Sequence, residues 1–202
     1  MGTLRGPIGK DGVHLCIDMQ RLFSRGGPWE ALWLERVLPV VSMSAAHQPA
    51  RTVFTRFIPT KSISDACGMW RNYYQKWRDV TLNTVDPELI DLVPELQKFV
   101  PPAERFNRKT YSAFADGRLH GWLRQRDIDT LILSGSETDV CVLATVLAAV
   151  DHGYRTIVVS DAVASSSDET HDALLRLYSN RFDIQIELST AEDVISAWSS
   201  LT

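Results

Sequence analysis

The sequence predicts one three-layer α/β/α domain, Rossmann-like, with a parallel sheet covered by helices on both faces. Short β-rich runs alternate with helical segments along the chain, which is typical of a parallel sheet with helical crossovers. Runs such as TLIL at 130–133 lack polar alternation, which indicates strands that are buried on both faces. The 202 residues also suit one domain with a sizeable core, so we expect residues 1–202 to form a single unit.

The strands and helices can be placed from local composition. Strands are expected at residues 13–19, 51–58, 104–108, 130–136, 155–163 and 183–188. Helices are expected between and after them, at 29–46, 87–99, 117–126, 138–152, 168–180 and 191–198. Ser166 and Glu169 read as a capping box that opens the fifth helix. Gly153 stands where the fourth helix needs a left-handed residue to end it.

Composition and charge exclude several classes of protein. Apolar residues make up 45% and charged residues 23%, which are ordinary values for a globular protein. The net charge is −4, so no basic field exists to attract nucleic acid or an anionic membrane surface. The opening residues lack the apolar segment of a signal peptide, and no apolar run approaches the roughly 20 residues that span a bilayer.

Cysteine usage indicates a reducing compartment. The three cysteines form an odd number and include no CxxC pair, so neither a disulfide framework nor a zinc site is predicted. We therefore expect a cytoplasmic protein that binds a small molecule, without nucleic acid or membrane partners. The helix after Cys141 is almost wholly apolar, and its Ala144, Ala148 and Ala149 would allow close packing, which suggests a homo-oligomer.

Three reactive side chains are predicted at one edge of the sheet. Asp18 ends the first strand, Lys109 follows the third, and Cys141 lies just after the fourth. Ligands of open parallel sheets bind at the carboxyl ends of the strands, so these residues should converge. With Thr138 as N-cap, Cys141 occupies the third helical position, where the helix N-terminus favours a thiolate and free N–H groups can bind an oxyanion.

This combination of residue types suits nucleophilic catalysis. A thiol needs a base to accept its proton and an acid to protonate the leaving group, and Asp18 can do both. Lys109 would hold the Asp18 carboxylate in its charged form. Taken singly, each residue has a plain structural reading: a core cysteine, a turn aspartate and a solvated surface lysine. Together they predict a hydrolase with an acyl-enzyme intermediate.

The motifs around these residues resemble those of the isochorismatase-like cysteine hydrolases. This family includes nicotinamidases, N-carbamoylsarcosine amidohydrolase, ureidoacrylate amidohydrolases and biuret hydrolase. The matching segments are IDMQRLF at 17–23, NRKTYSAF at 107–114, SGSETDVCVLAT at 134–145 and DAVASSS at 161–167. The resemblance covers nearly the whole chain.

The resemblance implies a six-stranded parallel sheet and a catalytic triad of Asp18, Lys109 and Cys141. It also implies a cis peptide bond between Ser136 and Glu137, which would place the N–H groups of Glu137 and Cys141 in one oxyanion hole. Nicotinamidases of this family hold a metal with histidines after the second strand. Residues 54–77 contain no histidine here, so we expect no metal and no cofactor.

An aromatic segment is expected to choose the substrate. GMWRNYYQKW at 68–77 carries two Trp and two Tyr, and helical spacing would place Trp70, Tyr73, Tyr74 and Trp77 on one face. This face could line the pocket or cover a core or subunit interface. An arginine fork would suit a carboxylate or ureido oxygen of the substrate. The residues that we expect to contact substrate are Gln20, Phe23, Arg56, Trp70, Arg71 and Tyr74.

The sequence thus predicts an amidohydrolase that cleaves a C–N bond of a small linear amide or of a ureido or carbamoyl compound. Two alternatives stay open. One is an isochorismatase-type vinyl-ether hydrolase, in which Asp18 protonates the substrate and Cys141 takes no part. The other is a non-catalytic protein that retains the fold.

Overall fold

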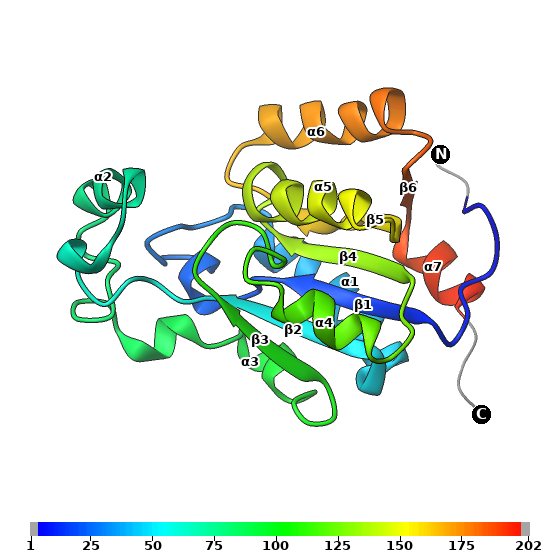
Figure 1. The fold of residues 1–202 in the computed structure, drawn as a ribbon, viewed down its shortest axis with the longest axis horizontal. Helices are drawn as coiled ribbons and strands as arrows, with labels where there is room; N and C mark the ends of the chain where they lie inside the picture. Colours follow the sequence, from blue (N-terminus) through cyan, green and yellow to red (C-terminus); the bar gives the residue numbers. More distant parts are fainter. Residues whose placement is uncertain (1–3, 199–202) are drawn as a thin grey trace.

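The computed structural model describes residues 4–198 and contains a six-stranded sheet (Figure 1). All adjacent strands are parallel, in the order β3-β2-β1-β4-β5-β6. The chain places β1 at the centre of the sheet, adds β2 and β3 on one side, and then crosses back to add β4, β5 and β6 on the other side. The predicted three-layer fold with six parallel strands is therefore confirmed.

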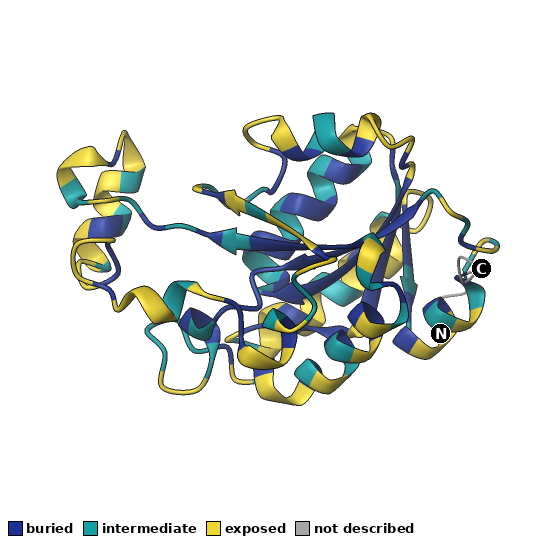
Figure 2. Cartoon of the chain, turned by 90° about the horizontal axis from the view of Figure 1, so that it is seen from below, coloured by how far each residue is buried: buried dark blue, intermediate teal, exposed yellow. Residues whose placement is uncertain are grey.

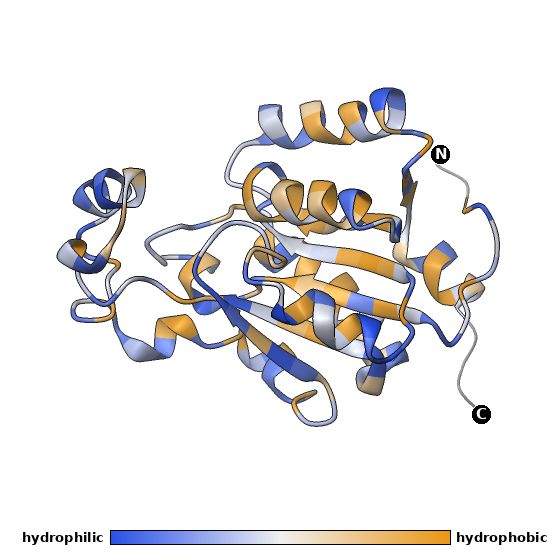
Figure 3. Ribbon diagram, viewed as in Figure 1, coloured by the Kyte–Doolittle hydropathy of each residue, from blue (hydrophilic) through white to orange (hydrophobic). Residues whose placement is uncertain are grey.

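The strands lie where alternation predicted them, within a few residues. Their bounds are β1 Gly12–Ile17, β2 Thr52–Phe57, β3 Glu104–Arg108, β4 Thr130–Ser136, β5 Arg155–Ala164 and β6 Ile186–Ser189. Every residue of β1 and β4 is buried, as expected for central strands. The edge strand β3 is mostly hydrophilic (Figure 3), which suits a strand with one open side.

Two layers of helices cover the sheet. One apolar cluster joins α1 (Leu34–His47), α3 (Pro94–Gln97) and α7 (Ala191–Ala197) to one face of the strands. A second cluster joins α4 (Arg118–Arg124), α5 (Leu143–Asp151) and α6 (Asp168–Arg181) to the other face. On α5, Ala149 is buried whereas Ala144 and Ala148 are half-buried, so close packing against another copy stays a prediction.

Two predicted helices are shorter than expected because loop hydrogen bonds replace helical ones. The first begins at Leu34 rather than residue 29, since the N–H groups of Trp29 and Ala31 donate to the carbonyls of Leu22 and Phe23 at 3.1 and 3.0 Å.

The expected helix at 87–99 is divided into a 3₁₀ turn, η4 (Pro87–Ile90), and α3. Between them the N–H of Val93 donates to Met19 O at 3.0 Å, and Pro94 disfavours helical geometry in the preceding residue.

The predicted helix ends are partly correct. Gly153 has φ +79°, as predicted for the residue that ends α5. The cap of α6 is Ser167 and not Ser166: the Ser167 hydroxyl accepts a hydrogen bond from the N–H of Thr170 at 3.4 Å. Short 3₁₀ turns also occur at η1 (Arg21–Phe23), η2 (Pro49–Arg51) and η3 (Ile63–Asp65).

The aromatic segment forms a helix that stands apart from the sheet. Helix α2 (Met69–Lys76) lies in a lobe beyond the carboxyl ends of the central strands (Figures 1 and 2), and most of its surface is exposed. Its one fully buried residue is Tyr74. Within residues 4–198, no helix has both the length and the apolar character needed to cross a membrane.

Candidate active site

Asp18 stands directly after β1, at the carboxyl edge of the sheet. Its side chain is fully buried, and its backbone has φ +47°, a left-handed conformation that aspartate tolerates better than most residues. The Thr55 hydroxyl donates to Asp18 Oδ1 at 2.7 Å, and the N–H of Asp18 lies 3.2 Å from Thr55 Oγ1. The neighbouring strand β2 therefore holds this carboxylate in place.

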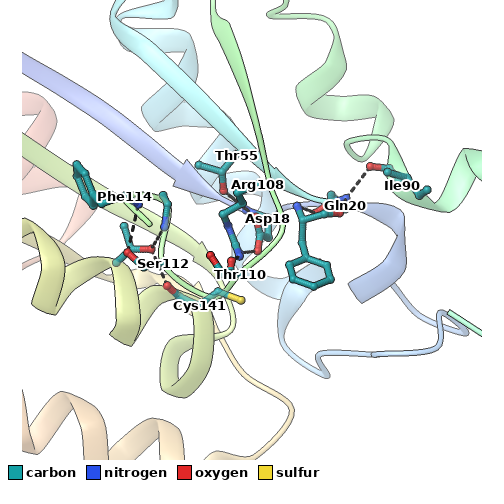
Figure 4. A network of polar contacts seen from close by, with 12 residues as sticks. Asp18, Gln20, Thr55, Ile90, Arg108, Thr110, Ser112, Phe114 and Cys141 are labelled. Carbon is teal, nitrogen blue, oxygen red and sulfur yellow. Dashed lines mark hydrogen bonds and ion pairs between the residues drawn. The ribbon is translucent and has the colours of Figure 1, made fainter. Parts of the chain in front are cut away.

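Arg108, and not Lys109, is the cation that meets Asp18. The Arg108 guanidinium forms an ion pair with Asp18 Oδ2, and the two side chains are 4% and 0% exposed (Figure 4). Lys109 is exposed and lines a surface hollow that does not include Asp18 or Cys141. The prediction that Lys109 joins the site is not met by this geometry, because successive side chains along an extended segment point to opposite sides.

The position of Arg108 also explains how a side chain from β3 contacts Asp18 at the end of β1, although β2 lies between the two strands. Arg108 pairs with Phe57 of β2, and its guanidinium lies 5.4 Å from the Phe57 ring centroid. A long side chain that lies over Phe57 thus spans the intervening strand. The guanidinium also donates to Thr110 O and hydrogen-bonds the sulfur of Cys141.

Cys141 lies in η5 (Thr138–Val142), a π-helical turn that leads into α5. The N-cap is Glu137 rather than the predicted Thr138, whose hydroxyl instead lies 2.9 Å from His171 Nδ1. The first turn is wider than an α-turn, and the N–H of Val142 donates to Glu137 O at 3.0 Å. Cys141 therefore remains in the opening turn, as the sequence predicted, one position further along.

Burial raises the pKa of the Cys141 thiol above its ordinary value, and two groups oppose this effect. The positive charge and hydrogen bond of Arg108 lower the pKa, and so does a hydrogen bond from the backbone N–H of Glu137. Burial outweighs both, so the resting group is a neutral thiol. A reaction at this sulfur consequently needs a group that accepts its proton.

The Ser136–Glu137 peptide bond is cis, at the position implied by the family resemblance. The preceding Gly135 has φ +109°, and a Cβ on this residue would lie 2.0 Å from Ile17 O, so only glycine fits between β4 and β1 here. The N–H of Glu137 faces the Cys141 sulfur. An oxyanion formed on a carbonyl that the sulfur attacks would therefore lie near a backbone N–H donor.

A cavity of about 330 Å³ opens over Cys141. Its volume is at the lower end of the range for small-molecule sites, so it suits a small substrate. Its polar lining consists of Glu30, Glu137, Cys141 and Ser166. Its walls are mainly aromatic, formed by Phe23, Trp29, Phe57, Tyr73, Trp77 and Tyr111.

Of the six residues expected to contact substrate, only Phe23 lines this cavity. Gln20 is fully buried and bridges backbone groups: its amide donates to Phe57 O at 3.0 Å and to Ile90 O at 2.6 Å, and its oxygen accepts from the N–H of Phe57 at 2.7 Å. Arg56 forms an ion pair with Asp91 and donates to Asn107 Oδ1 at 3.0 Å, outside the cavity.

The remaining three lie on α2 but do not line the cavity. Trp70 and Tyr74 pack with Phe57 in a small apolar cluster, and the Tyr74 hydroxyl accepts from the N–H of Thr60 at 3.2 Å. Arg71 is exposed and donates to Ala66 O at 3.3 Å. The aromatic segment nevertheless contributes Tyr73 and Trp77 to the wall, so it lines the pocket and forms a core at the same time.

Sequence reasoning did not identify Trp29, Glu30, Phe57 or Tyr111 as cavity residues. Trp29 and Glu30 lie in a loop without periodicity, so no pattern could have placed them. Tyr111 belongs to the NRKTYSAF segment, and its closeness to a site residue in the chain was an available signal. Phe57 ends β2, and the rule that ligands bind at strand ends would have identified it.

The described residues do not fit a resident metal. No group of three or more His, Cys, Asp and Glu side chains within 4–198 is arranged to hold an ion. Of the histidines, His14 is buried in the sheet 2.7 Å from Ser134 Oγ, whereas His120 and His152 stack on each other at a centroid distance of 4.1 Å. We therefore derive no step through a metal.

The fold and site together define a parallel α/β protein with a buried thiol, carboxylate and guanidinium at one sheet edge. The family model of the isochorismatase domain matches residues 13–192. The chain therefore belongs to the isochorismatase family, as the motifs predicted.

Relatives support this assignment. Nicotinamidase 3 of Arabidopsis thaliana is 33% identical over 175 residues, covering 85% of this chain and 82% of that protein. An uncharacterized isochorismatase family protein of Bacillus subtilis is 38% identical over 97 residues. The matched segment covers 47% of this chain and 53% of the length of that protein. A crystal structure of a cysteine hydrolase from Pseudomonas syringae pv. phaseolicola superposes on this chain with a TM-score of 0.80 at 21% identity. The superposition covers 98% of this chain and 97% of that one, and it shows a shared fold.

Proposed function

We propose that this protein is a cysteine amidohydrolase that cleaves the C–N bond of a small linear amide or of a ureido or carbamoyl compound. One observation carries the proposal: Arg108 contacts both the buried Asp18 carboxylate and the Cys141 sulfur, beneath a cavity sized for a small substrate. This arrangement of thiol, carboxylate and cation supplies a nucleophile, a base and a counter-charge.

The first half of the reaction forms an acyl-enzyme. Asp18 accepts the Cys141 proton, and the thiolate attacks the substrate carbonyl carbon. The N–H groups of Glu137 and Cys141 bind the oxyanion that forms. The C–N bond then breaks, and protonated Asp18 gives its proton to the departing nitrogen, so that ammonia or an amine leaves and a thioester remains.

The second half restores the thiol. Asp18 removes a proton from a water molecule that attacks the thioester carbonyl. The C–S bond breaks, the acid is released, and the proton returns to sulfur. Arg108 stays charged throughout and stabilises the anionic partner of each step, the Asp18 carboxylate or the Cys141 thiolate. In this proposal Arg108 takes the part that the sequence assigned to Lys109.

The proposal is tested by following intact protein mass during ammonia-release assays with nicotinamide, small aliphatic amides, carbamoyl amines and ureido acids. A transient mass increment located on Cys141, with ammonia release, is the expected result. Cys141→Ser should keep the fold and lose several orders of magnitude in kcat. Cys67 is an exposed free thiol, so Cys67→Ser provides the background in which an adduct on Cys141 is unambiguous.

A second pair of variants separates amide hydrolysis from vinyl-ether cleavage. Amide hydrolysis requires both Cys141 and Asp18, so Cys141→Ala and Asp18→Asn should both be inactive. If Cys141→Ala retained full activity on isochorismate while Asp18→Asn lost it, the vinyl-ether reaction would replace our proposal. A protein that released no ammonia and left Cys141 unlabelled by a thiol reagent would be a non-catalytic member of the fold.

A further inference from the structure

The cavity over Cys141 combines aromatic walls with carboxylates and contains no cation of its own. Among the residues that line it, two are acidic, Glu30 and Glu137, and none is lysine or arginine. Neither carboxylate forms an ion pair with a described residue. The arginines that could have favoured an anionic substrate, Arg56 and Arg71, lie elsewhere and bond to other groups.

The hydrogen bonds of the two carboxylates leave their charge unpaired. Glu30 Oε2 accepts the N–H of Gly26 at 2.9 Å. Burial raises the pKa of Glu137, and the hydrogen bonds that it accepts from Ser166 oppose this shift. Both partners are neutral donors, which hold a carboxylate in position without cancelling its charge. Arg108, the cation beneath the cavity, is already shared between Asp18 and Cys141.

Two tyrosines contribute rings to the wall. Burial is the largest cause that raises the pKa of the Tyr73 and Tyr111 phenols. The two phenols therefore remain neutral and present aromatic surface to the cavity. Because a ring face carries the negative end of its quadrupole, it attracts a positive charge.

The aromatic rings of the wall pack against Trp29. The Trp29 ring lies 5.6 Å from Phe57, 6.1 Å from Tyr73 and 6.1 Å from Trp77, with interplanar angles of 72°, 52° and 86°. These tilted and edge-to-face pairs form a connected aromatic wall beside the cavity.

Two rings of the wall already meet a cation from the chain. Phe57 meets Arg108 and Trp77 meets Lys76 at 5.4 Å. Within residues 4–198, no arginine or lysine lies over Trp29, Tyr73 or Tyr111. These three rings therefore have no cation–π partner among the described residues.

From these aromatic walls, the two acidic residues and the lack of a lining lysine or arginine, we infer that the substrate carries a positively charged group, a substituted ammonium, beside the amide that is cleaved. The inference rests on the proposed amide hydrolysis and specifies its substrate class. The ammonium group would lie against the aromatic wall near Glu30, while the carbonyl carbon lies against Cys141. The acid released by hydrolysis is then a zwitterion, whose new carboxylate is repelled by Glu137, which favours its departure.

Binding is tested first, because it does not depend on turnover. Choline and 3,3-dimethylbutan-1-ol have the same shape and differ by one positive charge. Titration of the wild-type protein with each compound, at constant chloride and followed by tryptophan fluorescence, compares their dissociation constants. We expect choline to bind at least tenfold more tightly, within the range of a desolvated cation–π contact.

Variants link this preference to the cavity. Glu30→Gln should weaken choline binding about fivefold and leave 3,3-dimethylbutan-1-ol binding unchanged. Glu35→Gln, an exposed acidic residue in the first turn of α1, is the matched control and should change neither constant. Equal binding of the two compounds, or an equal effect of the two variants, would overturn the inference.

Hydrolysis of a matched pair of amides completes the test. (Trimethylammonio)acetamide and 3,3-dimethylbutanamide are again isosteric, and the charged amide should show a kcat/KM at least tenfold higher. If the neutral amide were hydrolysed equally well with an adduct on Cys141, the inference would fail while the proposed function stood. If choline bound tightly but no amide in any panel released ammonia, the proposed function would fail and cation recognition would remain.

Discussion

The buried pair of Arg108 and Asp18 gives the sharpest prediction about this protein. Replacing Arg108 with alanine would leave a fully buried carboxylate without its counter-charge. Breaking a buried ion pair in this way costs roughly 3–5 kcal/mol of unfolding free energy. The Thr55 hydroxyl still donates to the other carboxylate oxygen, so we expect a loss near the lower end, about 3 kcal/mol.

Thermal unfolding measures this loss directly. For a chain of this size, each kcal/mol shifts the midpoint by about 2–4 °C, so Arg108→Ala should melt about 6–12 °C below wild type. Arg108→Lys restores a charge without the planar fork and should recover part of the stability. Lys109→Ala removes an exposed side chain and should change the unfolding free energy by no more than about 0.5 kcal/mol.

Activity provides the second readout. Arg108→Ala should lose nearly all turnover, because the charge that lowers the pKa of Cys141 and orients Asp18 is gone. Lys109→Ala should retain wild-type kcat. If Lys109→Ala were inactive while Arg108→Ala melted within 2 °C of wild type, the placement of Arg108 in the site would be wrong.

Three further predictions follow from buried groups. Burial lowers the pKa of His14 to about 4. The contribution of neutral His14 to the unfolding free energy is therefore complete above about pH 6.5 and is lost as the pH falls toward 4. Urea unfolding at pH 5 should show about 2 kcal/mol less stability from this residue than at pH 7, and His14→Phe should abolish this difference. Gln20→Ala removes three buried hydrogen bonds and should destabilise the protein by about 3 kcal/mol in urea titrations, whereas a substrate-binding role would change KM with no loss of stability. Because the pKa of Cys141 is raised, its alkylation by iodoacetamide in the Cys67→Ser background should still be increasing above pH 9, as followed by peptide mass spectrometry, and a plateau below pH 8 would contradict the raised value.

Much of the fold could be predicted because its signals are local. The central strands contain apolar runs such as TLIL at 130–133, and a parallel sheet is the arrangement that buries such runs on both faces. Asp18 and Cys141 could be placed at one edge because every parallel strand ends on the same side. The expected helix at 87–99 failed for the opposite reason: backbone bonds to a distant segment, at Met19, replaced its helical ones.

The cation of the site shows where local reasoning ends. Arg108 and Lys109 are adjacent, both are basic, and a motif does not say which of them points inward. That choice depends on the register of β3 against β2, which pairs Arg108 with the buried Phe57. A shift of one residue reverses the side of the sheet on which a side chain lies.

The sequence by itself determined the layered fold, the family, and the thiol and carboxylate at the sheet edge, because these follow from periodicity and from short motifs. Only the tertiary structure decided which cation meets them and which side chains surround the substrate. The aromatic residues of the cavity wall come from separate segments of the chain: Phe23, Trp29, Phe57, Tyr73, Trp77 and Tyr111. Their meeting over Cys141 depends on how the loops beyond the strands pack against one another, and no local pattern encodes that packing.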